Sequence, residues 1–204
     1  MVNATTLARV RAYLGIAVAE PVTTSTAERD ALLTVLVDGV SREIEGHLGF
    51  PLLQASRAEF YSPSSRIVQL NVVPIVSVSE VRTASEGSWD YTAGLALTAD
   101  QHYRLRGGRV GELFFLDGVL IYGFETLKVT YTAGFGTTDA LVIAAASDLA
   151  DAADMQVAEE WRRRADPQTI SRPGPKGATA LASPLVLMPR VRQILSRYRR
   201  RLVC

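Results

Sequence analysis

One continuous apolar stripe constrains the fold of this chain more than any other feature. Ser25 and Glu28 form a capping box, which is a typical helix start. Behind it, apolar residues recur at helical spacing up to Gly49 and Pro51. They are Leu33, Leu36, Val37, Val40, Ile44 and Leu48. The pattern predicts one helix from about Thr26 to Leu48, roughly 34 Å long at 1.5 Å per residue, which would be the spine of the core.

Two further helices are predicted from capping residues and apolar spacing. Thr5 or Thr6 can cap a short helix that ends near Gly15 and whose apolar face is Leu7, Val10 and Leu14. Asp139 can cap a helix from Ala140 to about Arg164. Its apolar face consists of Val142, Leu149, Val157 and Trp161. Arg162 to Arg164 lie at its carboxyl end, where the helix dipole favours cations.

The region from Arg57 to Thr132 predicts a small antiparallel sheet or barrel. Short β-branched and aromatic runs alternate there with turn residues. The runs are Arg66 to Val73, Ile75 to Val81, Val110 to Leu116 and Thr126 to Thr132. Pro74 separates two strands, and Gly107-Gly108 and Asp117-Gly118 are turn signals.

Together these patterns predict an α+β fold, in which a small helical bundle carries an inserted antiparallel β subdomain and an extended basic C-terminal arm. We expect the amino-terminal bundle helices in 1–56, the β-rich insertion in 57–137 and the third bundle helix in 138–165. Residues 166–204 are expected to form the arm and a basic helix. Seven prolines and glycines between Asp166 and Pro189 forbid a continuous helix there.

The charges are strongly segregated along the chain. The 204 residues carry 22 basic and 21 acidic side chains, a net charge of +1. From Trp161 onwards eleven basic residues face one acid, Asp166, which gives +10 and leaves −9 on the first 160 residues. A basic arm on an acidic body is typical of a protein that docks on an acidic partner or on nucleic acid.

No catalytic, cofactor or metal site is predicted. His47 and His102 have no metal-ligand spacing, the glycine pairs lack a phosphate-loop pattern, and the single Cys204 excludes an internal disulfide. Asp148, Asp151 and Asp154 recur every three residues, which we interpret as a solvated helix face. No apolar run approaches the roughly 18 to 20 residues of a membrane span, and Met1 to Tyr13 is not a secretory signal, so we expect synthesis in the cytoplasm.

Four stretches, in this order, resemble the head-to-tail connector (adaptor) family of tailed bacteriophages. They are Leu7 to Leu14, Asp30 to Pro51, Leu70 to Val78, and Lys128 to Gly136. The last is the most specific, with Tyr131, Thr132, Ala133, Gly134, Phe135 and Gly136 as the family motif. The chain departs from the family's common form in its Ser85 to Tyr103 excursion and its proline-rich arm.

The resemblance implies a non-enzymatic structural protein of the virion neck. It implies a homo-oligomeric ring, dodecameric in this family, that binds the portal and offers its far face to a stopper or tail-completion protein. DNA would pass through the ring without sequence-specific binding, and an acidic wall would let it slide. No cofactor and no membrane are implied.

The basic end of the chain is the candidate portal-docking segment. Its apolar positions would be anchors and its arginines would meet acidic groups on the portal. The docking residues are Arg190, Val191, Arg192, Ile194, Leu195, Arg197, Tyr198, Arg199, Arg200 and Arg201. One alternative is that the last helix packs on its own subunit. Another is that the chain binds nucleic acid through this arm.

Overall fold

The apolar stripe folds as one helix, α2 (Thr24–Leu48), in the computed structural model, which describes residues 2–16, 24–84, 90–108, 110–116, 123–165 and 187–198. All six residues of the stripe are buried, as predicted. The capping box is not the start of this helix, because Thr24 and Ser25 already belong to it. Gly49 follows the helix with a φ of +79°.

Contacts divide the chain into two compact units, and the predicted α+β class is confirmed. The helical unit comprises Met1–Leu52 and Thr138–Cys204, and the β unit comprises Leu53–Thr137. Its first strand begins at Ala55, so the insertion starts before the expected boundary at Arg57.

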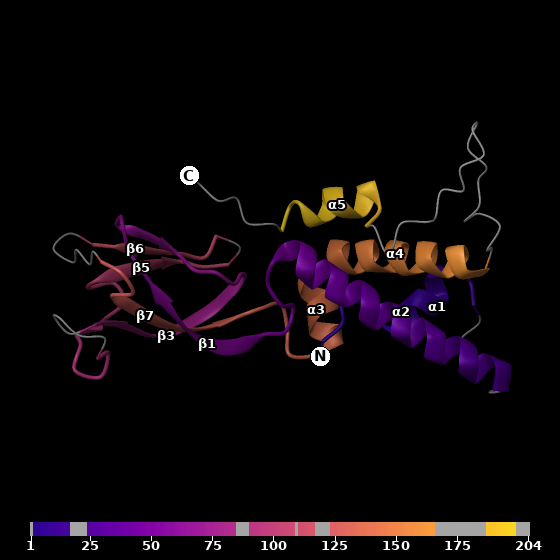
Figure 1. Cartoon of the computed structure of the whole chain (residues 1–204), viewed down its shortest axis with the longest axis horizontal. Helices are drawn as coiled ribbons and strands as arrows, with labels where there is room; N and C mark the ends of the chain where they lie inside the picture. Colours follow the sequence, from indigo (N-terminus) through magenta and orange to yellow (C-terminus); the bar gives the residue numbers. More distant parts are fainter. Residues whose placement is uncertain are drawn as a thin grey trace. The chain divides into compact units, whose positions relative to one another are not determined.

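Helix α4 (Ser147–Ala165) is the centre of the helical unit (Figure 1). It contacts the other four helices that the structure describes, namely α1 (Leu7–Tyr13), α2, α3 (Asp139–Ala145) and α5 (Pro189–Leu195). Ala150, Ala152, Ala153 and Ala158 are all buried. Their short side chains leave room for neighbouring helices on several sides of α4.

The single helix predicted from Ala140 to Arg164 is wrong, since α3 and α4 are separated at Ala146 (φ −145°, ψ 69°). The cap of α3 is Thr138 rather than Asp139, because the Thr138 hydroxyl accepts a hydrogen bond from the backbone N–H of Leu141. Asp139 instead accepts from the backbone N–H of Asn3 at 2.8 Å. Ser147, directly after the break, is a residue type that favours a helix start.

The amino-terminal residues are built into the helical unit. Val2, Ala4 and Thr5 are buried, and the backbone N–H of Ala4 donates to the Ser41 hydroxyl of α2 at 3.1 Å. Thr6 caps α1 by accepting from the backbone N–H of Arg9, which confirms the predicted cap.

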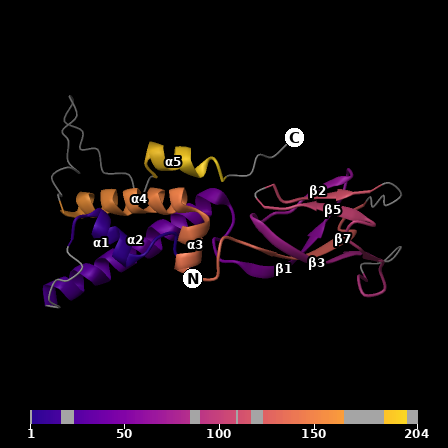
Figure 2. The same cartoon turned by 180° about the vertical axis from the view of Figure 1, so that it is seen from behind.

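The β unit consists of two antiparallel sheets in the part of the chain that the structure describes (Figures 1 and 2). The larger has the order β1 (Ala55–Tyr61), β7 (Leu127–Ala133), β3 (Ile75–Thr83) and β4 (Ala96–Leu97). The smaller has the order β2 (Ile67–Gln69), β6 (Glu112–Phe115) and β5 (Tyr103–Arg106). Leu127, Val129 and Tyr131 of the larger sheet and Leu113 and Phe115 of the smaller one are buried.

The strands differ from the prediction in two details, and one prediction is not tested. β2 is shorter than the predicted run from Arg66 to Val73, and the backbone N–H of Val72 bonds to the Tyr131 hydroxyl instead of to a neighbouring strand. β3 has two register shifts against β7, and Val76 is 55% exposed. The hairpin predicted at Asp117-Gly118 lies outside the described residues.

The two ends of the β unit lie side by side. Leu53 pairs with Gly136, and the backbone N–H of Gln54 donates to the Gly136 carbonyl at 2.9 Å. Gly134 has a φ of +126°, and a Cβ atom there would lie 2.5 Å from the Gln54 Cα. Only glycine allows this backbone conformation and this close approach.

Candidate interface on the helical unit

Helix α5 packs on α4 and α2 of its own chain through one apolar face. Val191 and Leu195 are fully buried, and Leu187 and Tyr198 are almost so. The last helix therefore packs on its own subunit, which was the alternative to docking on the portal. These residues are not available as anchors for a separate partner while α5 is seated, and Ile194 is only half-buried.

Polar contacts hold both ends of α5. The backbone N–H of Met188 donates to the buried Gln156 side chain of α4 at 2.9 Å, and Gln156 in turn donates to Glu160 at 3.1 Å. At the other end the Tyr198 hydroxyl donates to Asp148. These bonds fix the position of α5 along α4.

A carboxylate of α2 lies at the start of this contact. Burial and the neighbouring carboxylate of Glu160 raise the pKa of Glu43, whereas the backbone N–H of Leu187 and the Arg192 guanidinium lower it. One oxygen of Glu43 is buried without a hydrogen-bond partner among the described residues. The net upward shift means that the folded helical unit favours a protonated Glu43, although the two groups from the α5 side favour its carboxylate.

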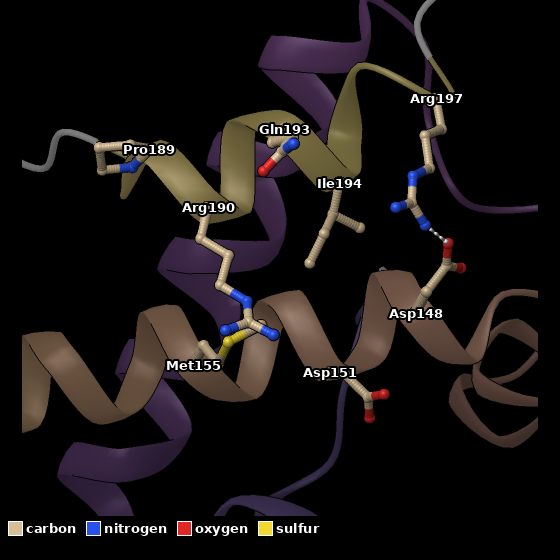
Figure 3. A pocket seen from close by; sticks show the side chains of 8 residues that line it. All are labelled: Asp148, Asp151, Met155, Pro189, Arg190, Gln193, Ile194 and Arg197. Carbon is tan, nitrogen blue, oxygen red and sulfur yellow. Dashed lines mark ion pairs between the residues drawn. The ribbon is translucent and has the colours of Figure 1, made fainter.

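A groove of about 580 Å³ runs between α4 and the solvent side of α5 (Figure 3). Asp148 and Asp151 of α4 contribute negative charge, and Arg190 of α5 and Arg197, which follows α5, contribute positive charge. The other lining residues are Met155, Pro189, Gln193 and Ile194. The Arg197 guanidinium lies 3.8 Å from the Asp148 carboxylate, which it faces in Figure 3.

Arg190, Arg192 and Arg197 are exposed. Arg190 and Arg197 line the groove with α4, whereas Arg192 lies on another side of α5, where it lowers the pKa of Glu43 of α2. Arg199, Arg200, Arg201 and Leu202 lie outside the described residues.

The interpretation of Asp148, Asp151 and Asp154 as a solvated face is wrong for Asp154, whereas Asp151 is exposed and Asp148 is half-buried. Asp154 is buried and accepts hydrogen bonds from the Thr5 hydroxyl and from the Arg9 guanidinium, at 3.1 and 2.9 Å from Arg9 Nε and Nη2. Asp151 accepts from the same guanidinium at 2.8 Å. The acidic row therefore holds α1 and α5 on α4, which spacing alone does not reveal, because the cationic partner is distant in sequence.

No metal-binding arrangement is present among the described residues, where no group of three or more His, Cys, Asp or Glu side chains is suitably placed. His102 accepts a hydrogen bond from the backbone N–H of Thr98 at 2.9 Å, and His47 is half-buried on α2. In the same part of the chain no helix has the length and apolarity to cross a bilayer.

The motif from Tyr131 to Gly136 lies in the β unit, at the end of β7 and beyond it. Tyr131 is completely buried, its hydroxyl donates to Glu59 at 2.7 Å, and burial raises its pKa to about 12. Tyr61 also donates to Glu59, and burial raises the pKa of Tyr61. Ala133, Gly134, Phe135 and Gly136 are buried and Thr132 is half-buried, so the motif shapes the β unit from within.

The β unit also exposes apolar side chains on both sheets. Phe60 of β1 is 50% exposed and stacks on Tyr91 at 5.1 Å between ring centroids. Ile67 and Phe114 are paired on neighbouring strands of the smaller sheet and are 47% and 43% exposed. Exposed paired apolar residues of this kind are typical of protein interfaces.

Comparison with solved structures reveals a shared fold over nearly the whole chain. A chain in the virion of a native gene transfer agent (GTA) particle is 19% identical with a TM-score of 0.57, covering 98% of this chain and 92% of that one. A chain in the neck of an empty GTA particle computed with C6 symmetry is 19% identical with a TM-score of 0.56, and the match covers 98% of this chain and 92% of that one. A chain in the neck of a native GTA particle computed with C12 symmetry is 18% identical with a TM-score of 0.55, and the match covers 98% of this chain and 91% of that one.

Comparison of the sequence with family models and with curated proteins identifies no relative. At 18–19% identity the structural likeness establishes the fold.

Proposed function

We propose that this chain is a structural, non-enzymatic subunit of the neck of a tailed phage or phage-like particle, where it acts as a head-to-tail connector. The observation that carries the proposal is the likeness to chains from GTA neck structures, which spans 98% of this chain and 91–92% of theirs. The family resemblance of four ordered sequence stretches supports the same function.

The proposed assembly is a homo-oligomeric ring of twelve copies. The C6 and C12 symmetries of the neck structures that contain similar chains support a ring with a multiple of six subunits. A closed ring needs two different complementary patches on each subunit. Both units have exposed apolar residues that such contacts would bury.

The proposed ring lies under the portal, extends the DNA channel and provides the platform for a stopper or tail-completion protein. The net charge of −9 on the first 160 residues would repel phosphates and let DNA pass without being held. The chain would be made in the host cytoplasm and would reside in the virion neck, without a cofactor.

The proposed portal contact uses the arginines at the end of the chain, without the apolar anchors. Val191, Leu195 and Tyr198 stay on α4, and Arg192 with Arg199 to Arg201 meet acidic groups of the portal. Deleting everything after Ala165 would therefore be a poor test, because it would also uncover the apolar seat of α5.

Electron microscopy of the purified chain mixed with its portal tests the proposal. We expect a second ring stacked on the portal ring, and its loss in a variant with Arg192→Glu and Arg199 to Arg201 replaced by Glu. Two variants are compared for a matched control: Arg200→Glu with Arg201→Glu should weaken the stacking, whereas Arg104→Glu with Arg106→Glu, which reverses two exposed arginines of β5, should not. A wild-type chain that never joins the portal would refute the proposal.

The exposed arginines of α5 favour one second candidate, a nucleic-acid-binding protein. DNA titrations at several salt concentrations separate the two functions. Tight binding that weakens steeply with salt would support the second candidate, because arginine contacts to phosphates release counterions.

A further inference from the structure

The groove between α4 and α5 has the chemistry of a protein-binding surface rather than of a phosphate-binding one. Met155 and Ile194 provide half-buried apolar surface within it. Arg190 lies over Met155 at one end, and Asp148 lies at the other (Figure 3). The groove has two carboxylates and two guanidinium groups around this apolar surface, so it favours an occupant that combines charges of both signs with an apolar residue.

The solvent side of α2 carries that same combination of groups. Glu28, Val35 and Arg42 are exposed and seven residues apart, so they lie on nearly one line along the helix. Val35 is 61% exposed, which makes it one of the most exposed large apolar residues of the helical unit. Ala31 is also exposed and leaves space for close approach of another helix. We call these four residues the α2 ridge.

The ridge projects where another copy can reach it. Figures 1 and 2 show the Thr24 end of α2 extending beyond the other helices of its unit. The opposite face of α2 is buried in the core, and no ridge residue lines the α4–α5 groove of its own chain. The ridge and the groove are therefore two separate patches of one unit.

We propose that the α2 ridge of one copy occupies the α4–α5 groove of the next copy in the ring. Val35 contacts Met155 and Ile194 in this arrangement. Arg42 lies about 10 Å further along the ridge, and Asp148 lies about 10 Å from Met155 along α4, since each pair is seven residues apart.

The charge of Arg190 sets the direction of the contact. Glu28, at one end of the ridge, meets Arg190 of the next copy. Arg42 lies at the other end, where the Asp148 carboxylate is already 3.8 Å from the Arg197 guanidinium of its own chain, so this end favours neither sign. The inserted α2 therefore runs parallel to the neighbour's α5 and antiparallel to its α4. With the opposite direction, Arg42 would meet Arg190, and like charges would repel.

This contact deepens the proposed function, on which it rests, by naming the two patches that close the ring. A ridge on one side and a groove on another give a heterologous interface, which repeats from subunit to subunit. Within this arrangement Arg190 belongs to the ring contact. Arg192 and Arg199 to Arg201 remain for the portal.

Chemical cross-linking tests the direction and the register. In a Cys204→Ser background, Glu28→Cys with Arg190→Cys should give ladders of linked subunits with a short bis-maleimide, both in concentrated protein and in portal-bound rings. Arg42→Cys with Arg190→Cys is the control pair, because Arg42 lies about 21 Å from Glu28 along the ridge. Equal ladders from both pairs would overturn the proposed register.

Charge exchange tests the pairing itself. Arg190→Glu and Glu28→Arg should each weaken self-association roughly tenfold, and the double variant should restore it. Val35→Asp should prevent assembly, whereas Leu141→Asp, at another exposed apolar position of the helical unit, on α3, should not. Unchanged thermal unfolding of each variant excludes misfolding as the cause.

The outcomes separate this contact from the proposed function. If Val35→Asp still forms rings, the proposed contact is overturned and the connector function stands. The same holds if the double variant Arg190→Glu with Glu28→Arg does not regain the self-association of the wild type. A wild-type chain that forms no ring on its portal overturns both.

Discussion

Replacing Leu195 by alanine is expected to release α5 from the helical unit without unfolding the rest. Leu195 is fully buried where α5 meets α4, and truncation of a buried leucine to alanine costs about 2–5 kcal/mol. Helix α5 has only seven residues and places few side chains against the other helices. A loss of that size is comparable to the free energy that holds so small a helix in place.

Amide hydrogen exchange measures this release directly. In the wild type the backbone N–H of Ser196 bonds to the Arg192 carbonyl at 2.9 Å and should be protected by the docking of α5. A loss of at least about 2 kcal/mol speeds its exchange roughly thirtyfold, since about 1.4 kcal/mol is a factor of ten. Amides in the middle of α4, such as that of Val157, should keep their protection.

A neighbouring substitution provides the control. Gln193→Ala changes an exposed residue of the same helix and should alter stability by no more than about 0.5 kcal/mol. Exchange in α5 that does not change in Leu195→Ala would refute the argument that its apolar face holds it. An equal loss of protection in α4 would refute the argument that α5 detaches alone.

Three further predictions concern single residues. Asp154→Asn should lower the free energy of unfolding by about 1.5–3 kcal/mol in thermal or urea unfolding, because it weakens two hydrogen bonds from Arg9, whereas the exposed Asp151→Asn should cost less than about 1 kcal/mol. The raised pKa of Glu43 stabilises the folded helical unit fully below the ordinary carboxyl pKa, and this contribution is lost as pH rises through the raised pKa. The free energy of unfolding of the wild type, relative to that of Glu43→Gln, should therefore increase as pH falls from 7 towards 4.5; a difference that stays constant over this range would assign no titration to Glu43. Gly134→Ala should cost at least about 3 kcal/mol in urea unfolding, since alanine disfavours a φ of +126° and its Cβ would collide with backbone; a smaller loss would mean that the backbone there relaxes.

Helices α1 and α2 could be predicted from sequence because their information is local. The stripe from Leu33 to Leu48 specifies α2 through spacing alone, and Thr6 caps α1 through its own hydroxyl. The strands were located as runs, but β2 is cut short because Val72 finds its hydrogen-bond partner in Tyr131, 59 residues away.

The candidate interface could not be predicted because its contacts join distant parts of the chain. The apolar face of α5 indicates burial, but an amphipathic pattern does not say on which surface. Asp154 looks solvated in sequence, and its burial follows from Arg9, 145 residues earlier. The break at Ala146 has neither proline nor glycine, and only the following Ser147 hints at a second helix start.

The paired ends of the β unit make it a portable cassette. The backbone hydrogen bond between Gln54 and Gly136 closes the insertion at its base, so the helical unit receives only two adjoining chain ends. A two-residue turn could bridge them, and evolution could lengthen, trim or exchange everything between them while the helices keep their sequence and packing. The insertion could thus acquire new surface specificity without redesign of the bundle that carries it.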